Sequence, residues 1–154
     1  MEYKVKELTV AEEKIRCSRL ILERLPDWFG IEESREAYIR ESADRVFFCA
    51  FDGEQPVGFL DLKETGKDTV ELAVMGVLKE YHRRGIGRLL FQAAKERAQQ
   101  MGYSFMQVKT VQMGKYEDYD KTNLFYLSLG FKEFEVFPTL WDEANPCQVY
   151  VMGV

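Results

Sequence analysis

The feature that most constrains this chain is a strand-like segment that runs straight into a strongly helical one through a basic turn with two glycines. Residues 77–88 read Val-Leu-Lys-Glu-Tyr-His-Arg-Arg-Gly-Ile-Gly-Arg. From Gly85 to Met101 apolar side chains recur at helical spacing, and Gly102 provides a stop. A helix that begins here presents N–H groups without intrahelical partners at the positive end of its dipole. The turn is therefore predicted to hold an anion such as a pyrophosphate, with Gly85 and Gly87 permitting its close approach.

Two other phosphate-binding motifs do not fit this turn. A dinucleotide fingerprint requires a third glycine where the chain has Leu90, and an acidic residue about 20 positions further on, where the chain has a hydrophobic strand. A Walker loop requires Gly-Lys-Ser/Thr, and the chain has Gly87-Arg88-Leu89 instead. Both nucleotide-binding classes are excluded.

Apolar spacing predicts further strands and helices on both sides of the turn. Thr9 followed by Glu12 resembles a capping box that opens the first helix. In the strand before the turn, Glu71 faces away from the large aliphatic side chains at alternate positions. The predicted elements are a strand at 3–8, helices at 9–25 and 33–43, strands at 46–51, 57–62 and 70–75, a helix at 85–101, a strand at 105–111, a helix at 121–129, and strands near 131 and 149.

Size and charge narrow the class of protein. At 154 residues the chain is predicted to form a single domain over 1–154. A net charge of -5 gives nucleic acid no general electrostatic attraction, so no nucleic-acid partner is predicted. The polar N-terminus lacks the apolar stretch of a signal peptide, and no run is long enough to cross a bilayer. We expect a cytoplasmic protein without a membrane partner.

The cysteines give no sign of a structural bridge or a metal site. Cys17, Cys49 and Cys147 are odd in number, widely separated and without metal-type spacing. They are predicted to be reduced and mostly buried thiols, and no metal cofactor is predicted.

The turn resembles the first signature of the GNAT superfamily of N-acetyltransferases. That signature is Gln or Arg, two variable residues, Gly, one variable residue, and Gly or Ala, and residues 82–87 match it except that His82 stands first. The resemblance implies that the backbone of the turn binds the pyrophosphate of acetyl-CoA, while the preceding strand pairs with the pantetheine arm. The matching positions are Met75, Gly76 and Val77 on the strand, and His82, Arg83, Arg84, Gly85, Ile86, Gly87 and Arg88 in the turn.

His82 is the only histidine, and two roles are open to it. It is a candidate general base, but a residue beside the diphosphate would be far from the acyl carbon, so a loop or cofactor-side role is favoured. The basic side chains around it are either a solvated surface or a local positive field that attracts a polyanionic cofactor to an acidic protein. These side chains are Lys79, Arg83, Arg84 and Arg88.

Residues 121–131 resemble the second GNAT signature, a short helix with an aromatic residue and tyrosine that ends in Leu-Gly-Phe before a strand. The resemblance implies that Tyr126 protonates the departing thiolate of coenzyme A. Its unperturbed pKa, near 10, would keep it protonated at neutral pH. The alternative is that Tyr126 only packs beside Phe125. Family members often carry Asn seven residues before the tyrosine; here that position is Tyr119, and Asn123 is the substitute that could contact the pantetheine arm.

Glu71 is the candidate general base. Attack on a thioester requires a neutral amine, whereas an alkyl amine is largely protonated at pH 7. Glu71 lies eleven positions before His82 (82 − 71), the offset at which some GNAT enzymes carry a base on the strand before the turn. It could act directly or through a water, and the alternative is a solvated strand residue.

Together the motifs predict a mixed α/β (α+β) fold, a GNAT-like, mostly antiparallel central sheet of about six or seven strands flanked by about four helices. The predicted function is direct transfer of an acetyl group from acetyl-CoA to a primary amine of a small molecule or peptide. A transfer route through a cysteine is less favoured, because no cysteine occupies a motif position. The alternative of another class is a non-catalytic sensor that binds acyl-CoA.

The identity of the acceptor amine and the oligomeric state are the properties that the sequence constrains least. The N-terminal helices and the loops at 113–120 and 138–146 are expected to choose the acceptor amine. Their acidic side chains could favour a cationic amine, or could be ordinary surface. The sequence leaves open whether the protein is a monomer or a homodimer.

Overall fold

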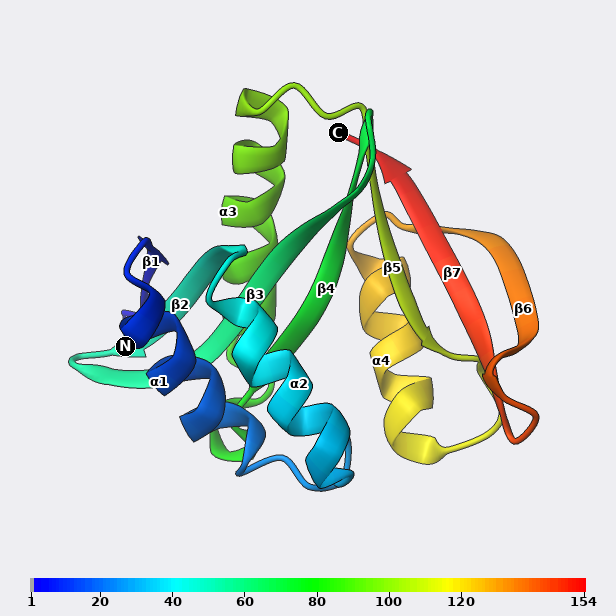
Figure 1. Ribbon diagram of the computed structural model, residues 1–154, viewed down its shortest axis with the longest axis horizontal. Helices are drawn as coiled ribbons and strands as arrows, with labels where there is room; N and C mark the ends of the chain where they lie inside the picture. Colours follow the sequence, from blue (N-terminus) through cyan, green and yellow to red (C-terminus); the bar gives the residue numbers. More distant parts are fainter. Residues whose placement is uncertain (1) are drawn as a thin grey trace. The chain divides into compact units, whose positions relative to one another are not determined.

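Seven strands and four α-helices, with one short 3-10 helix, make up the computed structural model, which describes residues 2–154 (Figure 1). The strands hydrogen-bond in the order β1-β2-β3-β4-β5-β7-β6, and of the recorded pairs only β4 with β5 is parallel. The predicted mixed α/β fold with a mostly antiparallel sheet is confirmed. In chain order the elements are β1 (Lys4–Leu8), α1 (Ala11–Leu22), α2 (Glu32–Ser42), β2 (Val46–Asp52), β3 (Gln55–Gly66), β4 (Thr69–Val77), the 3-10 helix η1 (Lys79–Tyr81), α3 (Ile86–Gln100), β5 (Phe105–Val111), α4 (Glu117–Ser128), β6 (Lys132–Asp142) and β7 (Asn145–Gly153).

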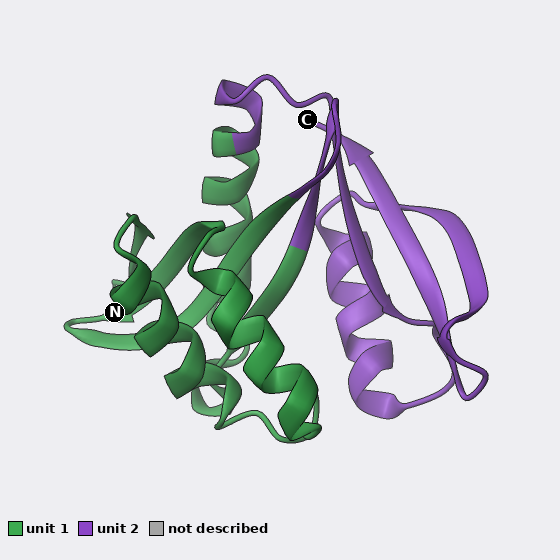
Figure 2. Ribbon diagram, in the orientation of Figure 1, with its two compact units in different colours: residues 1–63, 73–97 green, residues 64–72, 98–154 purple. Residues whose placement is uncertain are grey.

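Residue contacts divide the chain into two compact units (Figure 2). Unit 1 comprises residues 1–63 and 73–97, and unit 2 comprises residues 64–72 and 98–154. Strands β3 and β4 and helix α3 each contribute residues to both units. The single domain predicted over 1–154 stays a prediction.

Helices cover both faces of the strands in unit 1. Neighbouring residues of a strand point to opposite faces, and β3 illustrates this directly. Phe59 belongs to a buried cluster with residues of α1 and α2. At Gly58, a Cβ atom would lie 3.4 Å from Ile86 of α3. Helices α1 and α2 therefore cover one face and α3 covers the other, and burial of apolar side chains on both faces stabilises the unit.

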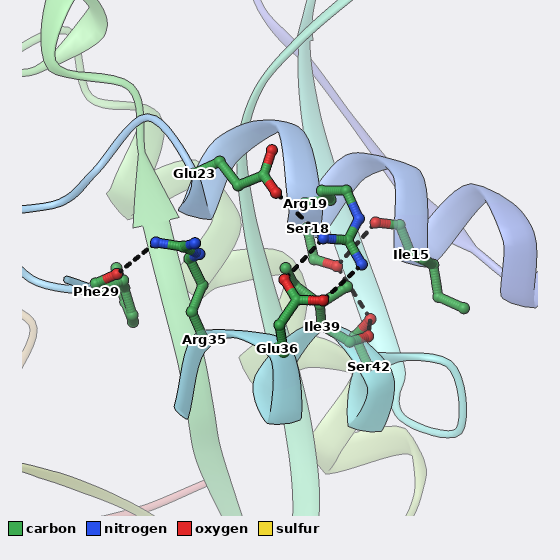
Figure 3. Close-up of polar contacts among 9 residues, drawn as sticks. All are labelled: Ile15, Ser18, Arg19, Glu23, Phe29, Arg35, Glu36, Ile39 and Ser42. Carbon is green, nitrogen blue, oxygen red and sulfur yellow. Dashed lines mark hydrogen bonds and ion pairs between the residues drawn. The ribbon is translucent and has the colours of Figure 1, made fainter. Parts of the chain in front are cut away.

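Polar contacts join helices α1 and α2 (Figure 3). The Ser18 and Ser42 hydroxyls lie 3.1 Å apart in a buried contact. On the exposed side, Arg19 donates two hydrogen bonds, of 2.7 and 3.0 Å, to the two carboxylate oxygens of Glu36. The exposed pair fixes geometry more than it adds stability, because water screens it. The two helices therefore share one defined alignment.

Unit 2 packs α4 on one face of β5 and β7. Val108 of β5 lies opposite Tyr150 of β7 in the antiparallel ladder, and both side chains are buried. Tyr126 and Phe131 complete an aromatic group with Tyr150, with ring centroids 5.9 to 6.4 Å from that of Tyr126. This group fixes α4 against the sheet.

Two predicted helix starts differ from the structure. The first helix begins at Ala11 with Val10 as its N-cap residue and without a side-chain capping bond, so the capping box predicted at Thr9 is wrong. The N–H of Glu13 and that of Lys14 instead bond to the Val10 carbonyl. Helix α4 begins at Glu117, four residues before the predicted start at 121. Its first turn is acidic, which the helix dipole favours.

Asp61 is a buried carboxyl within unit 1. Its side chain has no exposed surface, and Oδ1 accepts hydrogen bonds from the Val74 N–H (3.2 Å) and from Arg45 (3.4 Å). Oδ2 has no hydrogen-bond partner among residues 2–154. Burial raises the pKa of Asp61 to about 7, despite the opposing effects of the Arg45 charge and the Val74 N–H.

Asp61 should make the protein less stable as the pH rises. Its ordinary pKa of 3.8 applies to the unfolded chain, which releases the proton first. The free energy of unfolding therefore falls between about pH 4 and pH 7 and is level above. Asp61→Asn should remove this dependence, and its stability relative to the native protein should rise by about 3 kcal/mol from pH 5 to pH 8. Urea unfolding between pH 5 and pH 8 measures this change in relative stability. Asp44→Asn, at an exposed position, is the control. Equal pH profiles for Asp61→Asn and the native protein would contradict the prediction.

Candidate functional site

The turn before α3 has a backbone shape suited to an anion. After β4 ends, the Leu78 N–H donates to the Val57 carbonyl at 2.9 Å, which anchors the start of the turn to β3. Arg83 and Gly85 then adopt left-handed conformations, with φ of 64° and 79°. The Leu89 N–H bonds to the Gly85 carbonyl at 3.1 Å, so the first helical turn follows directly. Left-handed residues just before a helix start gather backbone N–H groups into a concave, positively polarised array.

The side chain of His82 fastens this turn to the strand that precedes it. Its Nε2 lies 2.7 Å from the carbonyl oxygen of Val77, the last residue of β4. A carbonyl only accepts, so Nε2 carries the proton. The imidazole also meets the Trp28 ring edge-on, with centroids 5.9 Å apart. This geometry supports the loop-side role favoured for His82, since the ring is engaged in holding the turn.

The basic side chains of the turn are exposed, and contacts within the protein orient Arg84 and Lys79. Arg84 donates to the Tyr3 hydroxyl at 3.1 Å and lies over the Tyr81 ring at 5.1 Å. Lys79 forms an ion pair with Asp27. Arg83, Arg84 and Arg88 are exposed, which leaves their charges at the surface beside the N-terminus of α3.

Gly76 has a packing reason as well as the predicted cofactor role. A Cβ atom there would lie 3.0 Å from Leu25 and 3.2 Å from Ile21 of α1. The carbonyl oxygen of Gly76 would lie 3.2 Å from a Cβ atom added to Gly58. The close approach of β3 to β4 therefore also requires a small residue at position 58. The recorded ladder of β4 with β5 covers Thr69–Glu71, which places residues 75–77 outside it. A backbone pairing of these residues with a pantetheine arm is compatible with this arrangement.

Tyr126 is buried in α4 and presents a protonated phenol. Only 7% of the residue is exposed, and its ring contacts those of Phe131 and Tyr150. Burial raises the pKa of Tyr126, with a smaller contribution from Tyr119. A phenol in this state retains its proton at neutral pH and has it available for donation.

Asn123 connects three elements of unit 2. Its Nδ2 donates to the carbonyls of Val111 (2.8 Å) and Tyr119 (2.7 Å), and its Oδ1 accepts from the Tyr150 hydroxyl at 2.6 Å. The residue is fully buried. Both amide hydrogens are therefore in use. This arrangement favours a positioning role, in which Asn123 holds the helix that carries Tyr126, and its contact with pantetheine stays a prediction.

Glu71 lies in an ion pair that the sequence did not reveal. Lys109 of β5 donates to its Oε1 at 3.0 Å, and the side chains are 11% (Glu71) and 30% (Lys109) exposed. The parallel ladder places Glu71 opposite Gln107, which fixes the carboxylate on the same face as Lys109. The pair orients Glu71, whose role as base stays a prediction.

Sequence reasoning missed Lys109, Tyr150 and a groove in unit 2. The two side chains were missed because strand register and helix docking are not readable from spacing. The groove has a volume of about 720 Å³ and opens on the strands beside Thr69 and Gln107. Its apolar lining includes Phe105, Phe134, Val149 and Val151.

The part of the chain that the structure describes contains neither a candidate metal site nor a candidate membrane-spanning helix. Across residues 2–154, no group of three His, Cys, Asp or Glu side chains is placed to hold a metal ion. In the same residues, no helix combines the length and the apolar character needed to span a membrane. The three cysteines are free and buried, as predicted.

Comparisons with known proteins agree with this geometry. A family model described as an acetyltransferase (GNAT) domain matches residues 43–133, more than half of the chain. That range contains the turn, Glu71, Asn123 and Tyr126. At the level of sequence alone, no curated protein matches the chain.

Solved structures share the fold over nearly the whole length. A proposed GNAT-family acetyltransferase from Desulfovibrio desulfuricans superposes with a TM-score of 0.86 at 15% identity, covering 99% of both chains. The PaiA N-acetyltransferase of Thermoplasma acidophilum, solved with coenzyme A, has a TM-score of 0.71 at 20% identity, covering 97% of this chain and 98% of its own. The ribosomal-protein-S18-alanine N-acetyltransferase of Escherichia coli has a TM-score of 0.76 at 15% identity, covering 99% and 94%.

A negative charge introduced at Gly87 should prevent binding at the turn. Gly87→Glu places a carboxylate in the first turn of α3, where it would repel a pyrophosphate and occupy its space. The affinity for coenzyme A, measured by isothermal titration calorimetry, should fall on the order of a hundredfold. Gln92→Glu adds the same charge at an exposed position further along α3 and should keep the native affinity. Equal binding by Gly87→Glu and the native protein would exclude this turn as the cofactor site.

Proposed function

The chain belongs to the GNAT family of acetyl-CoA-dependent N-acetyltransferases, and from that premise we propose that it moves the acetyl group directly to a primary amine of a small molecule or peptide. The observation that carries the proposal is the turn at Arg83 and Gly85, which gathers backbone N–H groups where α3 begins. The buried phenol and the ion-paired carboxylate of unit 2 supply the proton chemistry that aminolysis requires.

The residues of the turn fit the diphosphate of coenzyme A. Two left-handed residues and a helix N-terminus suit a group with two negative charges. Arg83 and Arg88 are exposed beside it and would add charge-assisted contacts. When bound, acetyl-CoA supplies the activated acetyl group. His82 would act indirectly, by keeping the turn attached to Val77.

Tyr126 is proposed to donate the proton that the departing thiolate takes up. A thiol ordinarily has a pKa near 8.5, so a thiolate in contact with a phenol of higher pKa is stabilised by the hydrogen bond and is then protonated from solvent or from the phenol. The burial that raises the pKa of Tyr126 keeps the phenol in its donating form. The Asn123 clamp holds α4, and therefore the phenol, in position.

Glu71 is proposed to accept, directly or through a water, the proton that the acceptor's ammonium group must lose before the neutral amine attacks the thioester. Its carboxylate is largely enclosed but retains some exposure, which permits contact with an acceptor. Lys109 fixes one of its oxygens at 3.0 Å, and the other oxygen remains for the proton. The ion pair thus orients the base.

Direct transfer is favoured over a route through cysteine. A nucleophilic thiol needs a lowered pKa and access to the substrate. Burial raises the pKa of Cys147, and the contact with Cys49 together with burial raises that of Cys17. All three cysteines are buried. None has the environment of a catalytic nucleophile.

Some acidic residues of the regions expected to choose the acceptor serve structure instead. Asp120 accepts a hydrogen bond from the Gly114 N–H at 2.7 Å, and Asp142 accepts three from Asn145. Glu117 is exposed and Asp118 is half-buried in the first turn of α4. These two are the better candidates to attract a cationic amine.

Loss of the Tyr126 hydroxyl should slow turnover without weakening cofactor binding. Tyr126→Phe removes the proton donor, so kcat should fall by about tenfold or more while coenzyme A affinity stays nearly unchanged. Thiol release from acetyl-CoA across a panel of amines, polyamines, amino acids and peptides measures the rate. Tyr103→Phe, which removes a hydroxyl bonded to Glu64, is the control. An unchanged kcat would remove Tyr126 from the mechanism, and binding without turnover of any acceptor would favour a sensor.

A role of Glu71 as base predicts a pH-dependent defect. Glu71→Gln should lower the rate most at neutral pH, where the acceptor is protonated, and the deficit should shrink as rising pH supplies neutral amine. The ratio of native to variant kcat/KM between pH 7 and pH 9.5 measures this. Lys109→Met is the companion variant, which keeps the carboxylate and removes its ion-pair partner. A ratio that does not change with pH would assign Glu71 a structural role.

A further inference from the structure

Two of the three cysteines are in direct contact inside unit 1. Cys17 lies on α1 and Cys49 on β2, 32 positions apart in the sequence, and their sulfur atoms are 2.8 Å apart. Both side chains are buried, with 3% and 0% exposed, within the cluster that joins α1 and α2 to the strands. The fold thus brings together two thiols whose sequence spacing suggests no relation.

The contact is closer than ordinary packing requires. Non-bonded heavy atoms rest comfortably at about 3.5–4.0 Å, whereas the sulfur atoms of a disulfide are about 2.05 Å apart. At 2.8 Å the pair lies between these limits. The Cys49 thiol also contacts the Ala50 carbonyl, at the longer distance of 3.6 Å. Bond formation therefore needs a shift of less than about 1 Å and disrupts no strong polar interaction.

We propose that Cys17 and Cys49 form a reversible disulfide that links α1 to β2, by exchange with a low-molecular-weight disulfide such as glutathione disulfide. The thiolate of one cysteine attacks a sulfur of glutathione disulfide, which forms a mixed disulfide and releases one glutathione thiolate. The second cysteine attacks the protein sulfur of that mixed disulfide and releases the other. The two protons lost by the cysteines end on the two glutathione molecules, so the cysteines are oxidised and the small disulfide is reduced.

The location of the pair determines when the bond forms. Folded α1 shields both sulfurs. The contact with Cys49, and to a smaller extent burial, raises the pKa of the Cys17 thiol. Thiol–disulfide exchange in the native state is therefore slow. Local opening of α1, or folding itself, exposes the thiols. The bond therefore forms readily during folding in an oxidising buffer and is protected afterwards.

The link would fix the helix that supports the cofactor strand. Ile21 lies one helical turn beyond Cys17, and with Leu25 it would contact a side chain placed on Gly76. A cross-link at Cys17 restricts separation of α1 from the sheet. Because it closes a loop of more than 30 residues, it restricts the unfolded chain substantially. The oxidised protein should thus be measurably more stable than the reduced one.

The experiment compares the two redox states of the full chain. Protein unfolded in denaturant and reductant is refolded in a glutathione redox buffer, and a second sample is refolded under reducing conditions. Acid quenching, alkylation of free thiols and peptide mapping by mass spectrometry identify the bond. The oxidised sample should contain a Cys17–Cys49 disulfide with Cys147 alkylated, and its Tm should be higher by about 5 °C or more. Dithiothreitol in denaturant should reverse both.

Three variants make the result specific. Cys147→Ser removes the third buried thiol and should behave as the native protein. Cys17→Ala and Cys49→Ala should show no redox-dependent change in Tm, and each is compared with itself in the two buffers, so that a packing defect does not affect the reading. The proposal is overturned if all three native thiols are alkylated after redox refolding, if glutathione adducts accumulate instead, or if the bond involves Cys147. None of these readouts depends on acetyl transfer.

Discussion

The N-terminus of α3 is the constraint on which the remaining architecture depends. Its N–H groups can receive an anion, as proposed, only if the chain enters the helix from one direction, and Arg83 and Gly85 set that direction through positive φ angles. A non-glycine residue at φ 64° is costly by about 1 kcal/mol and must be supported elsewhere. His82 supplies part of that support by bonding back to Val77.

Glycines on β3 and β4 allow the strand that precedes the turn to pack closely on both sides. Gly58 and Gly76 face one another closely enough that a Cβ on Gly58 would lie 3.2 Å from the Gly76 carbonyl. A Cβ on Gly76 would press against Ile21 of α1 and against Leu25, which follows that helix. The strand that leads into the turn is therefore positioned from both sides by contacts that tolerate little extra volume. A glycine that the motif explains as cofactor-binding also has a structural explanation, and substitutions there would change both properties together.

The sequence predicted the elements whose chemistry is local. The turn and α3 were predicted correctly in place and order because glycine positions and helical spacing are properties of neighbouring residues. Tyr126 lies on a helix as expected, and its catalytic role stays a prediction. The start of α1 was wrong because the Val10 carbonyl, rather than the Thr9 side chain, accepts the first-turn N–H groups.

What the sequence did not predict are the partners brought together by strand register and helix docking. Lys109 beside Glu71, Tyr150 beside Asn123, and the two sulfurs of Cys17 and Cys49 each join residues far apart in the chain. Spacing rules carry no information about such pairs, because a shift of one residue in strand register would turn the strand side chains to the other face, and helix docking is not encoded in spacing at all.

These long-range pairs determine how the local motifs could operate. Glu71 is held by a lysine on a neighbouring strand, so its carboxylate has a position set by the backbone ladder. In the proposed role of base, a carboxylate fixed in this way cannot adjust to different amines, and discrimination must come from how the acceptor is presented to it. Asp120 and Asp142 are occupied in stabilising their own turns. Acceptor choice should therefore depend more on the shape of these loops than on their total charge, which explains why counting acidic residues in the sequence does not identify the amine.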